Sequence, residues 1–456
     1  MTQAKKLTLF ALTWPIFIEV LLHMLMGNAD TLMLSQYSDD AVAAVGVSNQ
    51  ILSVVIVMFG FVATGAAILV AQNLGAEQKK EAGSISVTSL SVNLWFSLLL
   101  SFGLFVFSEQ ILNVMDLPVS LMRDATDYMN IVGGLIFVQA MLMTIGALLR
   151  SYGHTKDPMY VTIGMNILNV IGNYFVIFGP FGFPVFGVEG VAYVTAISRA
   201  FGFFVLLLLL IKRVSGDLPW RSFYHYEKAH IKNLLHIGVP SAGEQLSYNA
   251  SQMVITYFVA QMGATAITTK VYAQNLMMFI FLCSIAIGQG TQILIGHHIG
   301  AKETEKAYRQ CIRSLQLAIV ISLSVAVVFY FSSDFLLGLF TDDQTILATG
   351  GTLLLLTVLL EPGRAFNLVV INSLRAAGDV RFPVIVGILS MWGVQVTIAW
   401  IFGLHFSYGL IGIWIGFIVD EWLRGVLMLR RWKSRIWLKK SFVTQNEKAH
   451  SQANTS

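Results

Sequence analysis

Charged side chains are scarce in this sequence. Lysine, arginine, aspartate and glutamate make up 12% of the 456 residues, whereas a soluble globular protein carries about 25%. Cysteine is nearly absent, and Cys283 and Cys311 are too few for a disulfide framework or a cysteine metal site. The net charge of +4 is small and gives no support for nucleic-acid binding. These shortages argue against a soluble globular protein, a disulfide scaffold and a nucleic-acid partner.

Hydrophobic residues are abundant instead. They make up 56% of the chain, the mean hydropathy is +0.71, and apolar stretches long enough to span a bilayer recur from end to end. We therefore predict an all-α polytopic membrane protein with about 12 transmembrane helices. The expected helices cover roughly residues 8–35, 44–74, 86–108, 126–149, 159–179, 187–211, 233–262, 266–296, 312–332, 345–373, 384–404 and 409–430.

The positions of the basic residues indicate orientation. If the N-terminus is cytoplasmic, most lysines and arginines fall in inner loops and at the two ends of the chain, as Lys79, Lys80, Arg430 and Arg431 do. The outer loops are acidic, as in "SDD" at 38–40. By the positive-inside rule we expect a multi-pass protein of the cell (plasma) membrane with both termini in the cytoplasm.

Three separate segments of the first half recur in the second half, all at the same offset along the chain. "TGAAILVAQNLGAEQKKEA" resembles "QGTQILIGHHIGAKETEKA", and "LLRSYGHTKDP" resembles "SLRAAGDVRFP". The matching pairs are 64–82 with 289–307, 148–158 with 373–383, and Pro15 and Glu19 with Pro240 and Glu244. Agreement of three segments at one offset indicates an internal duplication.

The duplication predicts two six-helix lobes related by a pseudo-twofold axis. We expect an N-terminal lobe over 1–214, a cytoplasmic linker over 215–232, a C-terminal lobe over 233–440 and a polar cytoplasmic tail over 441–456. Six is an even number, so both lobes enter the membrane from the same side and the repeat is parallel. In transporters of this build the substrate site lies between the halves, and one half rocks against the other.

The first expected helix carries a polar stripe. Glu19, His23 and Asp30 share one helical face, with Met26 and Met33 beside them. Inserting a charged side chain at the bilayer centre costs about 2.5–3.5 kcal/mol, so the presence of each charged residue in this helix needs an explanation. One interpretation is a proton or cation site, with metal binding limited to Na⁺ at Asp30, on a face lining a substrate cavity. The other is a buried contact that holds helices together.

The fifth expected helix places Asn169 and Asn173 one turn apart. Their amide oxygens could complete a carboxylate-plus-amide site for a small hard cation or a bound water. Hydrogen bonds between helices are the alternative interpretation.

The second half carries two further polar groups. Glu244, Tyr248 and Ser251 form a stripe on the seventh expected helix, which would line the second lobe's face of the substrate cavity. Glu361 and Arg364, three residues apart on the tenth, can neutralise each other and are predicted to be a structural charge pair.

With these segments in hand, the chain resembles the MATE (multidrug and toxic compound extrusion) family. The resemblance covers residues 8 to about 432 and depends on segments such as "WPIFIE", "GAAILVAQNLGA", "NVIGNYFVIFG", "GVPSAGEQLSYN" and "NSLRAAGDVRFP" in this order. It implies a secondary active efflux antiporter with two six-helix lobes. Such a protein exports amphiphilic, often cationic compounds in exchange for H⁺ or Na⁺ by alternating access.

The resemblance also implies roles for individual residues. Asp30 matches the family's first-helix coupling aspartate, Asn169 fits the fifth-helix asparagine, and Thr195 matches a sixth-helix threonine. Asn173 stands where part of the family has a second aspartate. In one sodium-coupled branch, a glutamate lies near the position of Tyr248 and an aspartate falls on Arg364. This chain departs from that branch there, so coupling through the N-terminal lobe is expected.

Other functions remain open at this stage. A lipid-linked oligosaccharide flippase of the wider superfamily would share the repeat, although more spans and a strongly cationic cavity would be expected. An intramembrane enzyme would need a convergent motif, which the sequence lacks, so we expect no catalytic residues and no cofactor besides the coupling ion. The expected partners are drug-like small molecules and the lipid bilayer, with a monomer as the functional unit.

Overall fold

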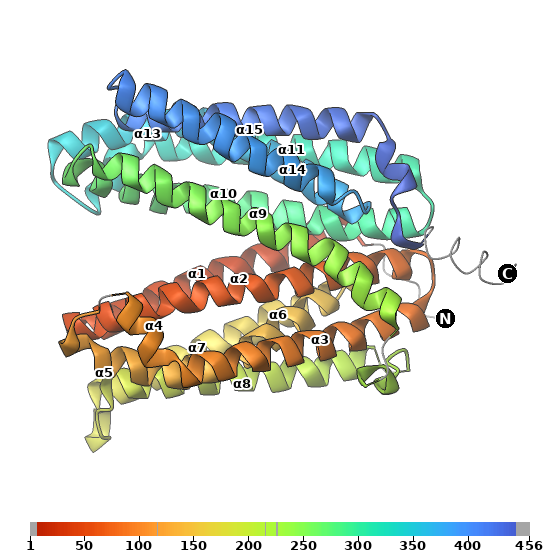
Figure 1. Cartoon of the computed structure of the whole chain (residues 1–456), viewed down its shortest axis with the longest axis horizontal. Helices are drawn as coiled ribbons and strands as arrows, with labels where there is room; N and C mark the ends of the chain where they lie inside the picture. The colour runs from red at the N-terminus through yellow and green to blue at the C-terminus, as the bar shows by residue number, and fades with distance from the viewer. Residues whose placement is uncertain (1–6, 116, 215, 225–226, 444–456) are drawn as a thin grey trace, which may run out of the picture. The chain divides into compact units, whose positions relative to one another are not determined.

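The computed structural model describes residues 7–115, 117–214, 216–224 and 227–443. Every regular element within these residues is helical, and none of them forms a strand. The predicted all-α fold class is therefore confirmed. The long helices are α1 (Leu9–Ser35), α2 (Asp39–Gly75), α3 (Lys79–Val106), α6 (Ile136–Ser151), α7 (Lys156–Phe178), α8 (Gly187–Arg213), α9 (Lys228–Ala260), α10 (Ala264–Gly300), α11 (Thr304–Phe331), α13 (Gln344–Ala376) and α15 (Leu410–Lys433) (Figure 1).

Shorter elements complete the chain. The short α-helices are α4 (Ser108–Val114), α5 (Val119–Tyr128), α12 (Ser333–Gly338) and α14 (Arg381–Ser390). Wider π-helical turns occur at η1 (Met129–Gly133), η4 (Met391–Val396) and η5 (Ala399–His405), and 3₁₀ turns at η2 (Pro180–Gly182), η3 (Trp220–Phe223) and η6 (Ile436–Lys439).

Nine helices of the described residues are long and apolar enough to cross a membrane, and a bent pair, Val119–Gly133 with Ile136–Ser151, makes a tenth. Each coincides with a predicted span. The remaining two predicted spans coincide with α9 and α15, which are long but more polar. In α15, for example, Asp420, Glu421 and Arg424 are charged. Many helices extend beyond the predicted limits, because the apolar stretch marks only the part within the hydrocarbon core.

Contacts divide the chain into two compact units. The N-unit consists of the described residues of Ile18–Val70 and Gln78–Gly238. The C-unit consists of those of Met1–Phe17, Ala71–Glu77 and Val239–Ser456. The predicted boundaries of the lobes, linker and tail remain a prediction.

The N-unit brings its long helices side by side, with α7 packed directly on α8. Glycines allow the close approach of this pair. A Cβ at Gly172 would lie 2.6 Å from Val194 Cγ1, and one at Gly190 would lie 2.7 Å from Val176 Cβ. Both distances are too short for a side chain, so the α7 and α8 backbones are fixed relative to each other.

The C-unit is built around buried aromatic residues. Trp414 and Trp432 are both fully buried on α15. Trp437 follows in η6 and stacks on Trp432 with ring centroids 4.3 Å apart, and its Nε1 donates to the Trp432 carbonyl at 2.8 Å. The η6 turn is therefore held against the end of α15.

Candidate ion-coupling site

Four polar residues of the N-unit form a hydrogen-bonded chain across three helices. Asn173 Nδ2, on α7, donates to Asp30 Oδ1, on α1, at 2.7 Å, and also to Asn169 Oδ1 at 3.2 Å. Asn169 Nδ2 in turn points to Thr195 Oγ1, on α8, at a longer 3.5 Å. The structure thus brings together all four residues that the sequence predicted for coupling, although contact alone does not establish that role.

The local sequence explains this arrangement. Asn169 and Asn173 are one helical turn apart, so both side chains lie on the same face of α7. Gly172 lets α8 approach that helix closely, which brings Thr195 within reach. Asn169 and Asn173 are fully buried, whereas Asp30 is half-buried. The amides therefore hold the carboxylate from its buried side.

One oxygen atom beside Asp30 has its hydrogen-bonding capacity unsatisfied. Asn173 Oδ1 is buried and has no hydrogen-bond partner within the part of the chain that the structure describes. An unpaired buried acceptor is costly and calls for a ligand. Next to a carboxylate, this oxygen could accept the proton of a neutral Asp30 or contribute to a Na⁺ site, since Na⁺ is a hard cation.

Arg199 was not expected at this site. It follows Thr195 by one turn on α8, and its charge acts on Asp30 and on Tyr128. Its Nε and Nη1 atoms are buried without hydrogen-bond partners among the described residues. The sequence could have indicated Arg199 as a residue of this site, because it lies in the sixth predicted span four residues after Thr195.

The other residues of the first helix are placed differently. Glu19 accepts from Arg150 Nη1, on α6, at 2.7 Å and 2.9 Å through its two carboxylate oxygens. Its carboxylate is therefore engaged by a guanidinium group. His23 is exposed, and Met26 and Met33 are half-buried, with Met33 packed against the core of the N-unit.

The same ion pair is repeated in the C-unit. Glu244, on α9, pairs with Arg375, on α13. Glu244 and Arg375 are the counterparts of Glu19 and Arg150 in the internal repeat, so the duplicated chain has kept both partners. The repeat in the sequence matches each of these residues to its counterpart, but it does not indicate that the glutamate and the arginine of one copy bind each other.

Tyr248 and Ser251 share the α9 stripe with Glu244 but not its surroundings. Tyr248 is exposed, whereas Ser251 is fully buried and its Oγ donates to the Tyr248 carbonyl at 2.8 Å. The hydroxyl of Ser251 is therefore bonded to its own helix. A substrate-cavity role for this stripe stays a prediction.

Glu361 and Arg364 form the expected pair, with Arg364 Nη1 2.7 Å from Glu361 Oε1. The pair is part of a larger buried network. Arg364 Nε also lies 3.7 Å from Glu421 Oε1, and Arg424 Nη2 lies 3.0 Å from Glu421 Oε1 and 2.6 Å from Asp420 Oδ2. Two neutral side chains also donate to this network. Asn367 Nδ2 donates to Glu421 Oε2 at 2.9 Å, and Ser390 Oγ donates to Asp420 Oδ1.

The comparisons with known proteins agree with the repeat. The MatE family model matches residues 15–175 and again 240–401, and the two matches begin at the repeat counterparts Pro15 and Pro240. The uncharacterised transporter YisQ of Bacillus subtilis (strain 168) is 55% identical over 436 residues, which cover 96% of each chain. The probable multidrug resistance protein NorM of Thermotoga maritima is 28% identical over 440 residues, 96% of this chain and 94% of NorM.

A solved structure adds the fold. A multidrug resistance MATE family transporter of the MOP superfamily, in an outward-facing conformation, is 20% identical with a TM-score of 0.87. The match covers 95% of this chain and 96% of that one. At this identity the likeness concerns the fold alone.

Spanning helices that carry hydrogen-bonded ionisable groups are typical of multi-pass membrane transporters. The family match extends over more than half of the chain. The chain belongs to the MatE family, whose members are transporters of the multidrug and toxic compound extrusion type and not enzymes.

Proposed function

We propose that the protein is an efflux antiporter whose coupling ion, H⁺ or Na⁺, binds at Asp30. The observation that supports this most is the hydrogen bond of 2.7 Å from Asn173 to Asp30, an acid of the first helix that, unlike Glu19, is not in an ion pair with an arginine of the described residues. A carboxylate within a membrane span is costly, which makes it a candidate for a functional site.

The surroundings of Asp30 suit an exchange. Its hydrogen-bond donor is a neutral amide, which favours the carboxylate without neutralising it. A proton or Na⁺ would remove the negative charge, and a cationic substrate would be favoured by the charged form. Ion and substrate would then stabilise different states, as coupling requires.

The test is transport by the full-length protein in proteoliposomes, with pH and Na⁺ gradients imposed separately. We expect one gradient to drive dye transport by the wild type and Asp30→Asn to abolish that dependence, because an amide cannot take up a proton or balance Na⁺. Asp342→Asn, at an exposed aspartate, is the matched control and should behave as wild type. Gradient-driven transport by Asp30→Asn at the wild-type rate would remove Asp30 from the mechanism.

The finer properties belong to the same proposal. The substrates are amphiphilic and often cationic compounds, in keeping with relatives that are named probable multidrug resistance proteins. The protein works as a monomer in the cell membrane. Both of its termini lie in the cytoplasm, a proposal supported by the distribution of lysine and arginine.

The flippase alternative has less support. A pyrophosphate-linked substrate would need several unpaired cations. Among the described spans, Arg364 and Arg424 are paired with carboxylates, and Arg199 lies within the field of Asp30.

A further inference from the structure

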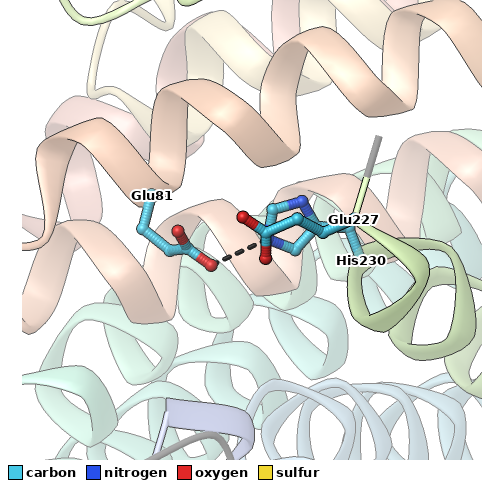
Figure 2. A group of neighbouring side chains, drawn as sticks. All are labelled: Glu81, Glu227 and His230. Carbon is cyan, nitrogen blue, oxygen red and sulfur yellow. Dashed lines mark hydrogen bonds and ion pairs between the residues drawn. The ribbon is translucent and has the colours of Figure 1, made fainter. Parts of the chain in front are cut away.

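Glu81, Glu227 and His230 converge away from the ion-coupling site. Glu81 lies in the first turn of α3, Glu227 directly precedes α9, and His230 lies in the first turn of α9. His230 Nε2 is 2.7 Å from Glu81 Oε1 and 3.7 Å from Glu227 Oε2 (Figure 2). All three residues belong to the N-unit.

The imidazole is the buried part of this cluster. His230 is 1% exposed, whereas the side chains of Glu81 and Glu227 are 35% and 63% exposed. His230 Nδ1 is buried with no hydrogen-bond partner within the described residues, so the protein satisfies only one of the two ring nitrogens. The cluster therefore combines a fixed imidazole with two carboxylates that solvent can reach.

We propose that Glu81, Glu227 and His230 bind a divalent transition-metal ion of the Zn²⁺ type. One donor atom from each residue lies within 4.8 Å of the other two. Bonds of about 2.0–2.2 Å in the tetrahedral geometry usual for Zn²⁺ place the ligand atoms roughly 3.3–3.6 Å apart. The separation of 3.7 Å between His230 Nε2 and Glu227 Oε2 is close to this value, and rotation of the partly exposed Glu81 side chain can open its 2.7 Å contact with His230. Imidazole favours zinc and its neighbours over Mg²⁺ and Ca²⁺, and water would complete the coordination.

The backbone already holds the donors in place. The His230 N–H donates to the Glu227 carbonyl at 3.0 Å, which fixes these two residues relative to each other. The preceding segment packs on α3, where Ser91 Oγ donates to the Phe223 carbonyl at 2.7 Å. A Cβ at Gly83 would lie 1.6 Å from the Asp217 carbonyl oxygen, so only glycine allows this approach. Little rearrangement is therefore needed for binding.

Within the described residues, the N-unit carries this cluster and the C-unit lacks it. In the internal repeat, the counterpart of Glu81 is Lys306, a cation that would repel a metal ion. Bound metal would link the start of α9 to the start of α3, two positions 149 residues apart. Its function would thus be to fasten the segment that joins the two halves of the sequence, independently of ion coupling at Asp30.

The test uses the full-length protein in detergent after removal of metals with a chelator. Isothermal titration with Zn²⁺ should show a site that also raises the thermal unfolding midpoint, with Mg²⁺ producing neither effect. Glu227→Gln removes an exposed ligand and should leave the fold intact. It should weaken Zn²⁺ binding at least about tenfold, since even indirect changes around metal sites cost 10–100-fold. His230→Asn should abolish binding.

The matched control is Glu303→Gln. Glu303 also contacts a histidine, with Oε2 2.9 Å from His298 Nδ1, but its other neighbour is Lys306 and not a second acid. This variant should bind Zn²⁺ as the wild type does. Absence of Zn²⁺ binding in the wild type would overturn the proposal. So would a Glu227→Gln variant with unchanged affinity and thermal shift, because Zn²⁺ would then be binding elsewhere.

Discussion

The buried carboxylates of this protein differ in the group that faces them. Glu19 and Glu244 are each held in an ion pair with the guanidinium group of an arginine. Asp30 instead accepts a hydrogen bond from the neutral amide of Asn173. At the scale of the residue, this difference separates acids suited to holding helices together from the acid suited to exchanging an ion.

Glu19 therefore provides a test of its structural role. Glu19→Gln and Arg150→Gln should each destabilise the protein, because either change leaves the partner partly buried and unpaired. The double variant should be less destabilised than the sum, with a coupling energy of about 0.5–3 kcal/mol. Unfolding of the four proteins in detergent measures this, and purely additive effects would show that the pair contributes nothing.

The sequence predicted residues better than their partners. Helical spacing places Asn169 and Asn173 on one face of α7 and Asp30 in the polar stripe of the first helix, whereas Thr195 came from the family resemblance alone. Arg150 was missed as the partner of Glu19, because periodicity describes one helix and says nothing of its neighbour. For the same reason, the stripe on α9 did not show that Ser251 bonds to its own backbone.

At the scale of the element, close packing of α7 on α8 positions the coupling site. The length of the apolar stretch predicted both helices, since that length is the main signal of a membrane span. It did not predict the bend of 42° between Val119–Gly133 and Ile136–Ser151. The π-helical turn and the adjacent Gly133–Gly134 explain this bend, and such local features leave hydropathy unchanged.

Gly172→Ala tests the role of helix packing. Its Cβ would lie 2.6 Å from Val194 Cγ1, so α7 and α8 must separate, at a cost of about 1–3 kcal/mol in stability. The rate of ion-dependent transport should also fall, because Thr195 on α8 would move away from Asn169 on α7. Gly164→Ala on the same helix meets its nearest atom only at 4.0 Å, so it should leave stability unchanged or raise it by up to about 1 kcal/mol. Equal thermal midpoints for the two variants would contradict this account of the packing.

At the scale of the whole molecule, the chain is a duplication that kept its ion pair and diverged elsewhere. Glu19–Arg150 and Glu244–Arg375 correspond residue by residue, and the second MatE match begins at Pro240, the repeat counterpart of Pro15. The Asp30 site and the charge network around Glu421 have diverged more: Arg199 corresponds to Arg424, but the counterpart of Asp30 is Ile255. The repeat was readable from the sequence because both copies kept the residues that bond to each other.

The two ion pairs should act independently. Each lies wholly within one unit and shares no partner with the other. The destabilisation by Glu19→Gln combined with Glu244→Gln should therefore equal the sum of the single effects to within about 0.5 kcal/mol. Thermal or denaturant unfolding of the three variants gives the comparison, and a larger deviation would show that the pairs are coupled.

The most direct test of the central claim is the ion movement that substrate itself elicits. Proteoliposomes containing the wild-type protein are loaded with a pH-sensitive dye or with labelled Na⁺, and a cationic substrate is then added. The account predicts ion flux opposite in direction to the substrate for the wild type and none for Asp30→Asn. Substrate-elicited flux of equal size in both proteins would contradict it.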